Sequence, residues 1–175
     1  HPHFIGGSLG WHDFLGSTAR LFKNDPGYRI PVKADPDIVI NHIRESHEVL
    51  VEALSEMGGI AIGGMYGVLP EPGNPTSLSV SMQGFIRDVV TQLKRGLDGF
   101  WVAHPDFVRT GIALVQAFHT DRLHELIAAL IDEPEARARL LAFVDGDDVA
   151  GLPRDDPRYP LGVLAADIAV SEVIA

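Results

Sequence analysis

The chain has 175 residues, a formal net charge of −10 and a pI near 5.1. A balance this acidic argues against nucleic acid and anionic membrane surfaces as partners, because both are bound mainly through Lys and Arg. Hydrophobic residues make up 46% of the sequence, enough for a folded core, but no apolar window reaches the roughly 18 residues of a membrane span. The lack of cysteine is compatible with a cytoplasmic protein.

Short apolar runs alternate with helical patterns in the first part of the sequence. Residues 4–9 form an apolar run that predicts a strand, and residues 13–22 follow with a helical pattern. A long helix is predicted over residues 36–58, with Asp35 as its N-cap. Residues 59–65 are apolar apart from glycine, which is typical of a parallel strand covered on both faces.

The second part begins with a loop over residues 69–77, a helix over residues 78–95 and a third apolar run over residues 99–103. Helical patterns then dominate, over residues 106–118, 122–131, 135–143 and from Leu161 onward.

Alternating strands and helices predict a parallel α/β fold, because parallel neighbours need a crossover helix. A (β/α)8 barrel needs about 250 residues. We therefore interpret residues 1–119 as the closing (β/α) units of a TIM barrel and residues 120–175 as a helical C-terminal segment. On this interpretation the chain is a piece of a longer one, and the rest of the barrel lies upstream of His1.

Candidate functional residues follow the predicted strands, where α/β folds bind their ligands. Asp13 follows the first strand and is suited either to Mg²⁺ binding or to capping the next helix. The pair Gly63 and Gly64 allows close approach of a ligand or of a packed helix. His104 ends the third strand, where a lone histidine more often caps or hydrogen-bonds than catalyses.

Three segments together resemble those of the malate synthase family. They are GWHDFLGS at residues 10–17, GGMYGVLP at 63–70 and DGFWVAHP at 98–105. The family has a GRWDYIFS-like, a GGM and a DGTWVAHP segment in the same order and at similar intervals. The resemblance covers roughly residues 3–110.

The resemblance implies a TIM barrel that condenses acetyl-CoA with glyoxylate, or a related 2-oxo acid, to malate with Mg²⁺ as cofactor. Asp13 matches the family's metal-binding aspartate. Gly10, Trp11 and His12 match the segment whose amides face the glyoxylate carboxylate, and Trp101 matches a wall of the substrate pocket.

The resemblance also places His104 and Pro105 near the acetyl-CoA channel, and it suggests Asp167, in ADIAVSEV, as the general base. Two departures are WHD in place of the family's RWD and DVVT, at residues 88–91, in place of a DKER-like track. Two alternatives remain open. One is an acyl-CoA lyase of the same barrel class, and the other is a catalytically degenerate homologue that serves as a structural or interaction module.

Overall fold

The computed structural model describes residues 3–25 and 41–146 and confirms an α/β fold with a three-stranded sheet in the order β1-β2-β3. The described residues fall into two compact units, which are treated separately below. One contains residues 3–25 and 41–61, and the other contains residues 62–146. Within the described residues, no helix is both long enough and apolar enough to cross a membrane.

The first unit contains strand β1 (Gly6–Ser8), helix α1 (Trp11–Leu21) and helix α2 (Asn41–Ser55). The long helix predicted over residues 36–58 is confirmed from Asn41, whereas its predicted N-cap, Asp35, lies outside the described residues.

Helix α2 packs against β1 through Leu54, which is buried, and a Cβ at Gly7 would lie 3.6 Å from Leu54 Cδ1. Beyond the helix, Gly58 has a positive φ of 63°, the conformation that commonly ends a helix. The chain then returns to the sheet, where the Ile60 amide donates to the Ile5 carbonyl at 2.9 Å.

Strand β2 (Ile60–Tyr66) and strand β3 (Gly99–Val102) are parallel and are joined by helix α3 (Pro75–Lys94). The register pairs Ile62 with Gly99, Met65 with Trp101 and Tyr66 with Val102. Strand β2 therefore has one residue more than β3 between the first two pairs, and it is irregular there.

Helix α3 begins three residues before its predicted start at residue 78, so the prediction of a loop through residue 77 was wrong. The Asn74 side chain accepts a hydrogen bond from the Ser77 amide at 3.1 Å, and Pro75 occupies the first helical position. This combination favours a helix start, because it satisfies one free amide and fixes φ in advance.

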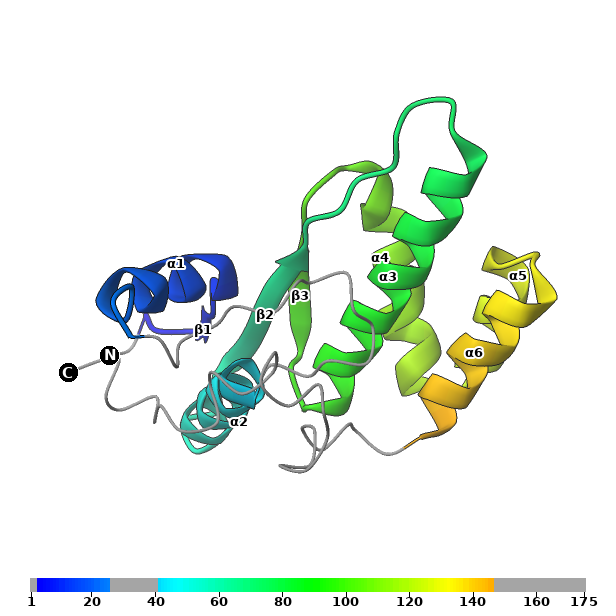
Figure 1. Cartoon of the computed structure of the whole chain (residues 1–175). Coiled ribbons are helices and arrows are strands. Elements are labelled where there is room, and N and C mark those ends of the chain that lie inside the picture. The colour runs from blue at the N-terminus through cyan, green and yellow to red at the C-terminus, as the bar shows by residue number, and fades with distance from the viewer. Residues whose placement is uncertain (1–2, 26–40, 147–175) are drawn as a thin grey trace. The chain divides into compact units, whose positions relative to one another are not determined.

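Three further helices, α4 (Asp106–His119), α5 (Leu123–Leu130) and α6 (Pro134–Asp145), complete the second unit. Helices α3 and α4 contact β3 and each other, and Figure 1 shows α5 and α6 farther from the strand. The core is aromatic where α3, β3 and α4 meet. Phe85 stacks on Phe107 with ring centroids 4.6 Å apart and meets Phe100 edge-on at 6.0 Å.

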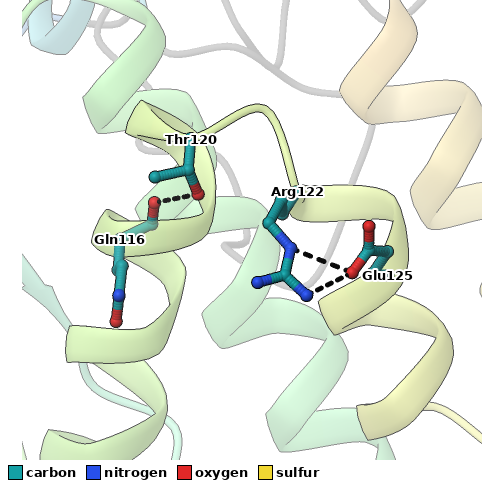
Figure 2. Close-up of polar contacts among 4 residues, drawn as sticks. All are labelled: Gln116, Thr120, Arg122 and Glu125. Atoms are coloured by element: carbon teal, nitrogen blue, oxygen red, sulfur yellow. Dashed lines mark hydrogen bonds and ion pairs between the residues drawn. The ribbon is translucent and has the colours of Figure 1, made fainter.

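Polar contacts define the turn between α4 and α5 (Figure 2). The Thr120 hydroxyl donates to the Gln116 carbonyl at 2.8 Å and closes the end of α4. Arg122 donates to Glu125 Oε2 from Nε at 2.9 Å and from Nη2 at 2.5 Å, at the start of α5. These hydrogen bonds and the opposite charge of Arg122 lower the pKa of the Glu125 carboxyl.

Two glycines allow β2 and α3 to approach closely, one from each element. A Cβ at Gly63 of the strand would overlap the side chain of Gln92 from the helix. A Cβ at Gly84 of the helix would overlap the phenol of Tyr66 from the strand. Each element therefore places a long side chain where the other has none.

We predict that Gly84→Ala lowers the free energy of unfolding by about 1–3 kcal/mol, because the added methyl group overpacks against Tyr66. Urea unfolding followed by circular dichroism measures this. The same substitution in a Tyr66→Ala background should be neutral or stabilising, since alanine then adds only helix propensity, worth up to about 1 kcal/mol.

The matched control is Gly16→Ala in α1, where a Cβ meets nothing within 4 Å and the substitution should not destabilise. An equal cost of Gly84→Ala with and without Tyr66 would contradict the steric explanation.

Candidate functional site

Asp13 lies within the first turn of α1. The helix starts at Trp11, two residues before its predicted start, so Asp13 is not the N-cap that the capping alternative required. Its carboxylate turns back toward the N-terminus of the helix, where a Cβ at Gly10 would lie 3.0 Å from Asp13 Oδ2. The Asp13 side chain is exposed.

The amides of Trp11 and His12 belong to the same first turn. First-turn amides have no carbonyl partner four residues earlier within their own helix, and they point toward any anion placed at its N-terminus. The first bond of the helical pattern runs from the Phe14 amide to the Gly10 carbonyl at 3.0 Å. The backbone here is suited to binding a carboxylate.

Trp101 lies on the face of β3 that points away from helices α3 and α4. Its neighbours Phe100 and Val102 face those helices, since Phe100 packs on Phe85 and Val102 pairs in register with Tyr66, which meets Gly84 of α3. Side chains alternate along a strand, so Trp101 points to the opposite face, together with its register partner Met65. It is 55% exposed, an unusual fraction for a tryptophan on a strand.

His104 and Pro105 directly precede α4. His104 Nδ1 accepts a hydrogen bond from the Asp106 amide at 3.2 Å, and the His104 carbonyl accepts one from the Phe107 amide at 3.1 Å. Pro105 occupies the N-cap position with helical φ and ψ of −55° and −31°. His104 thus makes a side-chain hydrogen bond to the first residue of α4, while the N-cap position itself belongs to Pro105.

A polar group on α3 adjoins the glycine pair of β2, and the sequence patterns did not reveal it. Gln92 Nε2 donates to Asp88 Oδ2 at 2.8 Å and, more weakly, to the Gly64 carbonyl at 3.4 Å. Burial and the nearby negative charge of Asp88 raise the pKa of the Tyr66 hydroxyl. The only signal in the sequence was the four-residue spacing of Asp88 and Gln92, which puts them on one helix face.

The sequence left open whether a ligand or a packed helix approaches the glycine pair of β2. At Gly63 it is helix α3 that approaches the strand. Gln92 is 3% exposed, and both its carboxamide and the Leu97 side chain lie within 3 Å of a Cβ placed at Gly63.

An open apolar groove of about 410 Å³ lies between β3 and α4. Its lining is apolar apart from Gln116 and consists of Gly99, Phe100, Val102, Val108, Gly111, Ile112, Val115 and Gln116. It has none of the converging charged or polar groups that catalysis needs, so we assign it no chemistry.

Among the described residues, no group of three His, Asp or Glu side chains is placed to hold a metal ion. These residues do not by themselves fit a Mg²⁺ site, which would need oxygen ligands beyond Asp13. The structure brings Gly10, Trp11, His12 and Asp13 together in the first unit, and Trp101, His104 and Pro105 in the second. Asp167 lies outside the described residues.

Residues 2–141 match the family model described as "Malate synthase, TIM barrel domain". This match covers well over half of the chain, which therefore belongs to the malate synthase family.

Curated relatives agree with the family match. The chain is 31% identical over 124 residues to the malate synthase of Streptomyces clavuligerus, covering 70% of this chain and 23% of that protein. It is 25% identical over 146 residues to malate synthase A of Escherichia coli K12, covering 83% and 27%. It is 26% identical over 108 residues to the glyoxysomal malate synthase of Gossypium hirsutum, covering 62% and 19%.

The chain thus spans about a quarter or less of the length of these relatives. No solved structure matches it.

We predict that Tyr66 makes the protein less stable at high pH. The pKa of its hydroxyl is raised in the folded state above the ordinary value of about 10, so folding favours the neutral form. The contribution of the neutral hydroxyl to the free energy of unfolding is therefore fully present below pH 10 and is lost as the pH rises further. Urea unfolding of the wild type and Tyr66→Phe at pH 8 and pH 10.5 tests this. The wild type should lose more free energy of unfolding than the variant between the two pH values, and an equal loss would contradict the prediction.

Proposed function

We propose that this chain forms part of a malate synthase-type enzyme, which condenses acetyl-CoA with glyoxylate, or a related 2-oxo acid, to malate. The observation that carries the proposal is the family match over residues 2–141, which includes the three ordered segments GWHD, GGM and DGFWVAHP. The (β/α) units of residues 1–119 would be the closing units of a TIM barrel, and residues 120–175 would be a helical C-terminal segment. The other strands of the barrel would come from elsewhere in the polypeptide. A cytoplasmic location agrees with the lack of cysteine.

The substrate contacts we propose are those that the resemblance to the family implies, and the local geometry of each segment is compatible with them. At the start of α1, the backbone from Gly10 to His12 would bind the carboxylate of the 2-oxo acid, because its first-turn amides are suited to an anion. Trp101 would form a wall of the substrate pocket, since it is exposed on the face away from the helices. His104 and Pro105 would shape the acetyl-CoA channel by fixing the first residue of α4.

Asp13 would supply one oxygen ligand of a Mg²⁺ site completed by residues outside those described. The chemistry that Mg²⁺ would supply there is Lewis acidity toward the oxygen of the oxo acid's aldehyde. The general base that removes an acetyl proton would be a carboxylate, and Asp167 remains the candidate within this sequence.

The degenerate-homologue alternative also has an observation in its favour. Arginine in the family's RWD segment is replaced by Trp11, and the described residues contain no complete metal-ligand group. The test below separates it, and the lyase alternative, from the condensing enzyme.

We expect the natural polypeptide that contains this chain to release CoA from acetyl-CoA only when glyoxylate and Mg²⁺ are present. Asp13→Asn should reduce this rate by more than about 100-fold, the upper range for loss of an outer-shell partner of a metal. It should also weaken Mg²⁺ binding in isothermal titration. Ellman's reagent measures the released thiol, and this chain contributes no cysteine background.

Glu52→Gln is the matched control, because it removes an exposed carboxylate from α2 in the same unit and should leave the rate unchanged. Cleavage of malyl-CoA without condensation would indicate the lyase. No turnover in either direction by a folded protein would indicate the degenerate homologue.

A further inference from the structure

Gln92 occupies an unusual position between α3 and β2. Its side chain is almost fully buried, and its amide nitrogen is held by Asp88 Oδ2 at 2.8 Å. Its other polar atom, Oε1, has no hydrogen-bond partner among the residues that the structure describes, and it fills the space that a Cβ at Gly63 would take. A buried carbonyl oxygen without a partner is destabilising, so packing alone favours an apolar residue here.

The strand irregularity lies at the same place. One extra residue of β2 is inserted between Ile62 and Met65, and this interval contains Gly63, which Gln92 overlies, and Gly64, whose carbonyl it reaches at 3.4 Å. An extra residue changes which face each following side chain occupies, and such irregularities often re-aim a side chain beside an active site.

The side chain re-aimed in this case is Met65. Beyond the irregularity it pairs in register with Trp101, on the face opposite α3, while Tyr66 turns back to meet Gly84 on the helix. Without the extra residue, the alternation of side chains after Ile62 would be shifted by one position.

We propose that Gln92, itself oriented by Asp88, is a positioning residue that holds the extra residue of β2 and thereby keeps Met65 beside Trp101. The physical effect does not depend on the enzyme activity. Its consequence for catalysis rests on the proposed function, in which Trp101 forms a wall of the substrate pocket.

The spectroscopic test uses Trp101 as a reporter in the present chain. Trp11→Phe leaves Trp101 as the single tryptophan, because the sequence contains two. In this background Gln92→Met keeps a side chain of similar length and removes both hydrogen bonds. We expect Met65 to lose its place and acrylamide quenching of Trp101 to increase.

A second variant keeps the proposal testable if Gln92→Met fails to fold. Gly63→Ala leaves Gln92 unchanged, but the added methyl group overlaps Oε1 and displaces the same side chain from the strand side. The control is Gln83→Met, on the same helix, where Gln83 Nε2 donates to the Ser79 hydroxyl of its own helix at 3.1 Å and does not reach β2. Quenching should increase in both test variants and remain unchanged in the control.

The kinetic test uses the natural polypeptide that contains this chain. A pocket wall that moves by about 1 Å can lower the rate by up to about 100-fold. We therefore expect Gln92→Met to reduce kcat/KM for glyoxylate by about 10-fold or more, with Gln83→Met unchanged.

Two outcomes would overturn the proposal. One is unchanged Trp101 quenching in Gln92→Met and Gly63→Ala, and the other is quenching that changes equally in Gln83→Met. If the polypeptide has no condensing activity, the proposed function fails, but the quenching result still decides whether Gln92 positions Met65.

Discussion

The second unit depends on a reciprocal fit between strands and helices, in which a glycine on one element faces a long side chain of the other. Gly63 of β2 faces Gln92, Gly84 of α3 faces Tyr66, and a Cβ at Gly111 of α4 would lie 3.1 Å from the Phe100 ring. The aromatic core around Phe85 lies where α3 and α4 meet β3, and Trp101 is exposed on the other face of β3.

Much of this arrangement was predictable from local patterns in the sequence. The apolar runs over residues 59–65 and 99–103 correctly predicted β2 and β3. The helical patterns between residues 106 and 143 correctly predicted α4, α5 and α6. The start of α3 was missed because Asn74 and Pro75 stand in a stretch rich in proline, where a loop and a helix cap share the same residue types. The pair of Gln92 with Gly63 was not predictable, since residues far apart in sequence meet only when the helix packs on the strand.

The candidate site was less predictable from local patterns than the fold. Its residues were selected by resemblance to the malate synthase family, and the described residues form no complete metal site. What the structure adds is local. Asp13 bends back over the first turn of α1, Trp101 points away from the helices, and His104 accepts the Asp106 amide at the start of α4. The two departures from the family pattern also have different surroundings. In the WHD segment His12 is exposed, whereas in the DVVT segment Asp88 is hydrogen-bonded to Gln92.

The reciprocal glycines also constrain how this sequence can change over time. A side chain at position 84 overlaps Tyr66, so it fits this packing without strain when position 66 becomes small, whereas a side chain at position 63 needs room from both Gln92 and Leu97. We therefore expect substitutions at positions 66 and 84 to be coupled in evolution, with the cheaper order being loss of the large side chain before replacement of the glycine.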